Sequence, residues 1–170
     1  MNVKEEFDTV AAWGVTTTIA YLLTPYIGLL NITAIGLNYQ ILLMWTLFMA
    51  PPIYMSYKQG KGPLGWKSLN PIWAIFMLVG LLGNFAGQIS LTGESLILSY
   101  YHKWFLLPGA LFIYTAYEMS DLSQKIYGVA AALNLAAVAA LVLTPSFQIY
   151  AFQTAAVIQG LPMIIDWYTR

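Results

Sequence analysis

Residues 71–90 read PIWAIFMLVGLLGNFAGQIS, and residues 104–117 read WFLLPGALFIYTAY. Both stretches are apolar and contain no charged residue. A bilayer core about 30 Å thick requires roughly 20 consecutive apolar residues in one helix. The two stretches and the polar connection between them therefore predict a pair of membrane-spanning helices, and the rest of the chain repeats this pattern.

The overall composition favours the same class of protein. Hydrophobic residues make up 59% of the 170 residues and charged residues only 8%, whereas a soluble domain carries about 25% charged residues. We therefore predict a multi-pass integral membrane protein with a single domain, residues 1–170. The formal net charge is zero, which implies no general attraction to nucleic acid.

Six apolar stretches are long enough to form spans. The predicted helices cover about 9–30, 39–57, 71–91, a fourth that begins between 95 and 104 and ends near 118, then 126–144 and 147–167. The connections between them are short, which favours antiparallel neighbours in a compact all-α bundle of six transmembrane helices.

The basic residues predict the orientation of the bundle. With the N-terminus inside, all but one of them fall on the cytoplasmic side, namely Lys4, Lys58, Lys61, Lys67, Lys125 and Arg170. Lys103 falls outside. By the positive-inside rule we expect both termini to be cytoplasmic, in a membrane of the plasma-membrane type.

The aromatic residues predict two interfacial belts, because Trp and Tyr gather at membrane–water interfaces. We expect Trp66, Trp73, Tyr127 and Trp167 at the inner interface, and Tyr100, Tyr101, Trp104 and Tyr150 at the outer one. Asp166, Trp167 and Tyr168 are interpreted as an anchor that caps the inner end of the last helix. No ionisable residue is expected in the middle of the membrane, which disfavours proton pumps and ion-coupled transporters.

Two faces of small residues predict close helix crossings, because small side chains let two backbones approach. The first face lies on the third predicted helix and consists of Gly80, Gly83 and Gly87. The second lies on the fifth and consists of Gly128, Ala132, Ala136 and Ala140. The two faces either pack within the chain, including against each other, or one of them faces another chain.

Pro51 and Pro52 lie inside the second predicted helix. Each proline removes a backbone donor and crowds the preceding turn. We predict a kink or break there, either filled by neighbouring side chains or serving as a hinge with exposed carbonyls.

The candidate ligand-binding residues form two groups. Asn84 and Gln88 share the glycine face of the third helix, while Glu94, Tyr100, Tyr101, His102 and Lys103 surround the outer connection. The amides Asn84, Gln88, Asn134, Gln148, Gln153 and Gln159 are all expected to point into the bundle, as interhelical hydrogen-bonding groups or as a polar lining for a ligand. His102 is either an interfacial side chain or part of an outer site.

No catalytic or metal-binding set is recognisable. The chain has one His and no Cys, which excludes a multi-ligand metal site of imidazole or thiolate groups within this chain; the cofactor is unknown. We favour a non-catalytic subunit that packs with other membrane chains and lipids. The alternative is a bundle that binds or transports a neutral or hydrophobic molecule such as a lipid, quinone, pigment or sterol-like compound. A third possibility is a membrane enzyme that uses His102 and Glu94.

Overall fold

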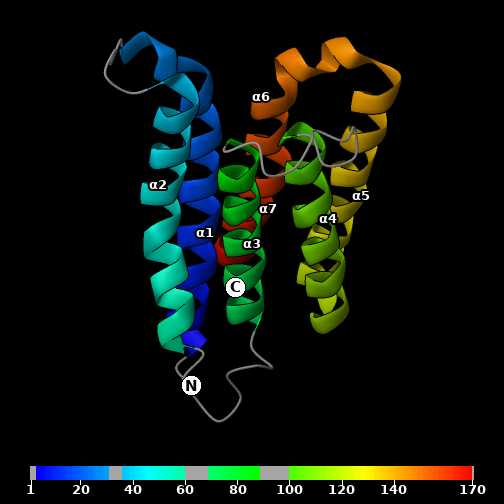
Figure 1. Cartoon of the computed structure of the whole chain (residues 1–170). Helices are drawn as coiled ribbons and strands as arrows, with labels where there is room; N and C mark the ends of the chain where they lie inside the picture. Colours follow the sequence, from blue (N-terminus) through cyan, green and yellow to red (C-terminus); the bar gives the residue numbers. More distant parts are fainter. Residues whose placement is uncertain (1–2, 31–35, 60–68, 89–99, 170) are drawn as a thin grey trace.

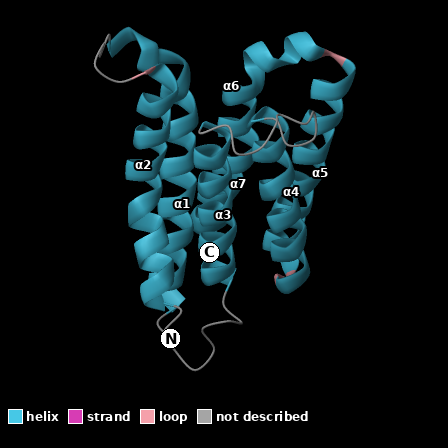
Figure 2. Cartoon of the chain, in the orientation of Figure 1, coloured by secondary structure: helices cyan, strands magenta, loops and turns pink. Residues whose placement is uncertain are grey.

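The computed structural model describes residues 3–30, 36–59, 69–88 and 100–169. Apart from short turns, all of this is helical (Figures 1 and 2). Its helices are α1 (Val3–Leu23), α2 (Leu37–Gln59), α3 (Leu69–Gln88), α4 (Tyr100–Glu118), α5 (Asp121–Leu143) and a sixth segment. That sixth segment consists of α6 (Ala151–Ala155), the π turn η3 (Ala156–Gly160) and α7 (Leu161–Thr169). Two 3₁₀ turns, η1 (Thr24–Leu30) and η2 (Pro145–Tyr150), follow α1 and α5. The fold is therefore all-α with six helices, as predicted.

The six helices close into a ring in chain order. Each of α1 to α4 packs against the next, α5 packs against α4 and α7, and α7 returns to α1. Figure 1 shows α1 beside α2 and α4 beside α5, with α3 and α7 between these two pairs. Both chain ends lie in the lower part of Figure 1. We call this end of the bundle the lower end and the opposite end the upper end.

Three helical stretches in the described part of the chain are long and apolar enough to cross a membrane. They are Thr9–Ile27, Asp121–Leu143 and Pro145–Thr169, and Ile72–Gly83 forms a shorter apolar helix. The chain is therefore a helix bundle with candidate transmembrane helices.

The interior of the bundle is filled largely by indole rings. Trp13, Trp45, Trp73 and Trp104 are each at most 7% exposed. Three of them donate to a hydroxyl on another element: Trp13 Nε1 to Ser56 Oγ (3.0 Å), Trp45 Nε1 to Thr24 Oγ1 (3.0 Å) and Trp73 Nε1 to Thr115 Oγ1 (3.1 Å). A buried indole needs such an acceptor for its N–H, and these bonds join α1 to α2, α2 to η1, and α3 to α4.

The predicted interfacial positions of Trp73, Trp104 and Tyr127 are wrong, because all three side chains are buried. The exposed Tyr and Trp rings gather at the two ends of the bundle instead. Tyr54, Tyr117, Trp167 and Tyr168 are exposed at the lower end, and Tyr26, Tyr39 and Tyr150 at the upper end. The Trp167 and Tyr150 expectations agree with this distribution.

The proline pair does not break its helix. α2 continues as one helix through Pro51 and Pro52 to Gln59. The sixth segment, by contrast, is interrupted near its proline. Its π turn ends at Gly160, two residues before Pro162. Pro162 has no N–H for the carbonyl of Ile158, and a widened turn is one way in which a helix accommodates this loss.

Candidate functional site

The polar groups inside the bundle centre on Gln159, which lies in the π turn and is 2% exposed. Its Oε1 accepts a hydrogen bond from the Tyr21 hydroxyl (2.8 Å), and its Nε2 donates to Asn134 Oδ1 (2.8 Å) and to the Trp104 carbonyl (2.8 Å). These four residues, which we call the hub, belong to α1, α4, α5 and the π turn. One amide thus joins four of the six helical segments.

The bond to Trp104 follows from the sequence of α4. In a regular helix the Trp104 carbonyl would accept from the N–H of residue 108, but residue 108 is proline and has none. The Gln159 amide supplies the missing donor from another helix. Gln159 therefore satisfies a backbone group that would otherwise be costly to bury in a membrane bundle.

Above the hub, aromatic rings continue the packing. Trp45 and Trp104 stack with ring centroids 5.6 Å apart, and Tyr21 meets Trp45 edge-on at 4.6 Å. The Thr24 hydroxyl that accepts from Trp45 donates in turn to the Ala20 carbonyl (2.7 Å). Polar and aromatic contacts therefore extend from the hub toward the upper end.

Below the hub lies Asp166, a fully buried carboxylate on α7. Its Oδ1 accepts from the Ser123 hydroxyl and its Oδ2 from the Tyr127 hydroxyl (2.8 Å), both on α5. The interpretation of Asp166 as an interfacial anchor is therefore wrong. We call Ser123, Tyr127 and Asp166 the clasp, because they fasten α7 to α5.

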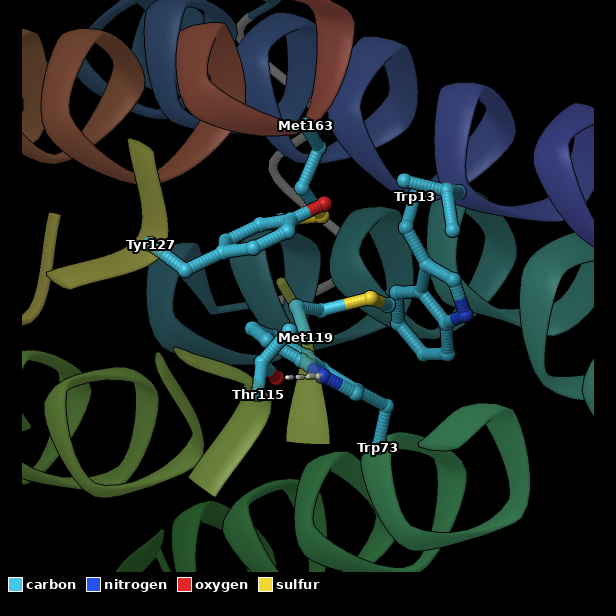
Figure 3. Close-up of a pocket in the computed structure, with 7 residues that line it drawn as sticks. Trp13, Trp73, Thr115, Met119, Tyr127 and Met163 are labelled. Atoms are coloured by element: carbon cyan, nitrogen blue, oxygen red, sulfur yellow. Dashed lines mark hydrogen bonds between the residues drawn. The ribbon is translucent and has the colours of Figure 1, made fainter. Parts of the chain in front are cut away.

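A small cavity of about 20 Å³ lies on the axis of the ring, and we call it the axial cavity. Figure 3 shows the rings and thioethers that surround it and the bond from Trp73 to Thr115. Five helices contribute to its walls: α1, α3, α4 with the residue that follows it, α5 and α7. The lining residues are Val10, Trp13, Trp73, Thr115, Met119, Tyr127 and Met163. This volume is about that of one water molecule, so a lipid- or quinone-sized molecule does not fit there.

The predicted outer group is described only in part. His102 is buried at the start of α4, Lys103 is half-buried beside Gly83, and Tyr101 contacts the ring of Phe152. Glu94 lies outside the described residues, as do the side chains of Asn84, Gln88 and Tyr100. Whether these candidate residues together form a ligand-binding site therefore stays a prediction.

The other amides divide between the interior and the surface. Asn134 and Gln159 are buried, as expected, and both belong to the hub. Gln148 and Gln153 are exposed, so their predicted inward orientation is wrong. They lie on η2 and on the outward side of α6, where the chain turns at the upper end.

The two small-residue faces have different surroundings. On α3, a Cβ at Gly80 would lie 3.0 Å from the Trp104 ring, so this glycine makes room for α4; Gly87 lies on α3 with its surroundings undescribed. On α5, a Cβ at Gly128 would meet nothing within 4 Å. Ala132 and Ala136 are exposed and Ala140 is half-buried. Because α4 separates α3 from α5, the two faces do not meet in the described bundle.

One close helix crossing was not predicted from the sequence. It joins Gly14 of α1 to Gly160 of the π turn, where a Cβ on Gly160 would overlap Thr18 Oγ1 and one on Gly14 would lie 3.0 Å from the Gly160 carbonyl. The clasp was missed as well, and of the hub only the inward orientation of Asn134 and Gln159 was predicted, not their partners. The signal for both is a spacing of seven residues, Tyr127 to Asn134 on α5 and Gln159 to Asp166 on the sixth segment, which keeps polar side chains on one helix face.

The arrangement is suited to holding helices together. The Gln159 amide uses both N–H donors and its oxygen in hydrogen bonds within the chain. Among the residues that the structure describes, no three His, Asp or Glu side chains come together as potential metal ligands. Comparison of the chain with protein-family models, curated proteins and solved structures found no match.

Proposed function

We propose that this chain is a six-span integral membrane protein that acts as a non-catalytic subunit, with the outward face of α5 as its contact for a transmembrane helix of another chain. The observation that carries the proposal is the exposure of Gly128, Ala132 and Ala136. In a membrane, small residues stabilise helix pairs through close backbone approach rather than through the hydrophobic effect. A face of this kind left outward is therefore suited to a partner helix.

The exposed surface supports the membrane part of the proposal. Exposed Tyr and Trp side chains lie at the two ends of the bundle, as interfacial belts require. Between them the exposed side chains are aliphatic on several helices, including Leu47 on α2, Val79 on α3, Ile113 on α4 and Val129 on α5. This pattern supports six spans rather than three, because α2, α3 and α4 present the same apolar surface as the longer helices.

The interior supports a structural role. Both N–H groups and the oxygen of the hub amide have partners inside the chain, and the axial cavity has room for about one water molecule. A binder of lipid- or quinone-sized molecules needs a pocket of some 300 Å³ or more. The axial cavity is far smaller than this, so the subunit hypothesis is preferred to small-molecule binding at the axis of the bundle.

The test is the mass of the protein extracted from its native membrane in polymer-bounded nanodiscs, measured by native mass spectrometry. We expect the wild-type chain to carry a partner chain. Ala132→Leu should release it, because a large side chain prevents close approach on the α5 face. Ala50→Leu is the matched control, since Ala50 is exposed on α2, away from that face.

Two results would contradict the proposal. One is a wild-type chain that is monomeric under these conditions. The other is equal loss of the partner in Ala132→Leu and Ala50→Leu, which would place the contact elsewhere on the surface.

A further inference from the structure

Three features of the sixth segment belong together, and the first is a hinge. The π turn Ala156–Gly160 separates α6 from α7, and Pro162 follows it. π turns are rare and interrupt the regular i→i−4 bonding of a helix, and both they and prolines mark points where helices bend. Gly160 also lies close to the Gly14 backbone and the Thr18 side chain of α1, so small residues of α1 adjoin the turn.

The second feature is the clasp at the other end of α7. Ser123 and Tyr127 of α5 both donate to Asp166, seven residues beyond Gln159. Gln159 is held by the hub on the hinge side. Two hydroxyls and one carboxylate therefore fasten the segment after the hinge to α5, while its other side packs against α1.

The third feature is open space beside the end of α7. A hollow of about 360 Å³, open to the outside, lies at the lower end between the α4–α5 turn and Thr169. Ser123 of the clasp lies at its inner wall, and the exposed residues Glu118 and Asp121 lie at its rim. The C-terminal end of α7 thus borders space into which it can move.

We propose that α7 is a movable strap that swings at the π turn, with the clasp holding it in the closed position described here. Met163 of α7 and Tyr127 of the clasp both line the axial cavity. When α7 swings away from α5, these two walls separate and the cavity opens toward the hollow. The strap therefore controls access to the interior from the lower end.

Two spin labels can measure this motion, because the chain contains no Cys and introduced pairs are the sole thiols. Val129→Cys on α5 and Tyr168→Cys on α7 report the strap, since both native side chains are exposed. Val15→Cys on α1 with Val129→Cys is the reference pair for the bundle. Distances are measured by pulsed electron resonance in the full chain in nanodiscs.

The clasp is weakened by Tyr127→Phe, which keeps the ring that stacks on Phe112, and then by Ser123→Ala added to it. Each substitution removes one interhelical hydrogen bond, so each should raise the population of a longer Val129–Tyr168 distance about three- to twentyfold. The Val15–Val129 distance should not change. Adding Pro162→Ala restores a backbone donor at the hinge and should return the longer population toward the wild-type level.

The proposal is overturned if the strap distance is unchanged in either clasp variant while the reference distance shows an intact bundle. It is also overturned if Pro162→Ala has no effect on the longer population, because the motion would then not occur at the π turn. Should the double variant fail to fold, Tyr127→Phe alone, which leaves one clasp bond in place, decides between these outcomes.

Discussion

Gln159 shows how two prolines in different helices define the role of one side chain. Pro108 leaves the Trp104 carbonyl without its helical donor, and the π turn before Pro162 contains the amide that replaces it. The same amide also contacts Tyr21 and Asn134. Because an unsatisfied carbonyl inside a membrane bundle is costly, the residue at position 159 must be long, neutral and able to donate twice.

Gln159→Leu should therefore destabilise the protein strongly. It removes three interhelical hydrogen bonds at similar side-chain size, for an expected loss of about 2–5 kcal/mol in unfolding free energy. Unfolding in mixed micelles or by steric trapping measures this. Adding Pro108→Ala should recover part of the loss, because it gives the Trp104 carbonyl a backbone donor again.

The control for this substitution is Gln153→Leu, on the same segment but exposed. We expect a change within about 0.5 kcal/mol there. If Gln159→Leu is tolerated as well as Gln153→Leu, the hub does not hold the four segments together.

At the scale of elements, the crossing of α1 with the sixth segment leaves little room, because Gly160 has the nearest neighbouring atom of the glycines described. Gly160→Ala would place a methyl group against Thr18 Oγ1 and 3.0 Å from the Gly14 carbonyl. Overpacking of this kind costs about 1–3 kcal/mol. We expect a lower unfolding free energy, measured as for the hub, and partial recovery when Thr18→Ala removes the hydroxyl.

Gly128→Ala is the matched control on α5, because nothing lies within 4 Å of its added methyl group. Alanine also loses less backbone entropy than glycine in a helix, so we expect a gain of about 0.5–1 kcal/mol. Equal effects of the two substitutions would show that α1 and the π turn are not in close contact.

The helices themselves could be predicted from the sequence, but which face of each helix is buried could not. Apolar length located six helices, since a membrane span requires that length wherever it packs. The glycine and alanine spacing on α5 identified a surface suited to close approach, yet Tyr127 and Asn134 occupy its buried side. Spacing alone does not say which of two opposite faces of a helix turns inward when both are apolar or small.

The site was harder to predict because its bonds join residues far apart in the chain. Tyr21 and Gln159 are separated by 138 positions, and no local pattern links them. Trp73, Trp104 and Tyr127 were assigned to the interfaces because aromatic residues usually lie there. Trp73 and Tyr127 instead have partners on neighbouring helices, Thr115 and Asp166, which allow the rings to be buried.

At the scale of the whole molecule, the ring of helices implies a definite topology. If all six helices cross the membrane, successive connections lie on alternating sides. If only Thr9–Ile27, Asp121–Leu143 and Pro145–Thr169 cross it, the connections between α2 and α4 remain on one side. The two arrangements place some of the described helix ends on different sides of the membrane.

Single cysteines at Gly36, Lys58, Ser120 and Ser146, all exposed, distinguish the two arrangements with a membrane-impermeant maleimide. Six spans predict that Gly36→Cys and Ser146→Cys react only in right-side-out vesicles, and Lys58→Cys and Ser120→Cys only in inside-out vesicles. Three spans predict that Gly36, Lys58 and Ser120 share one side and that Ser146 lies opposite. Because the exposed tyrosines at both ends of α2 match two interfaces, we expect the alternating result, and labelling of Gly36→Cys and Lys58→Cys from the same side would contradict it.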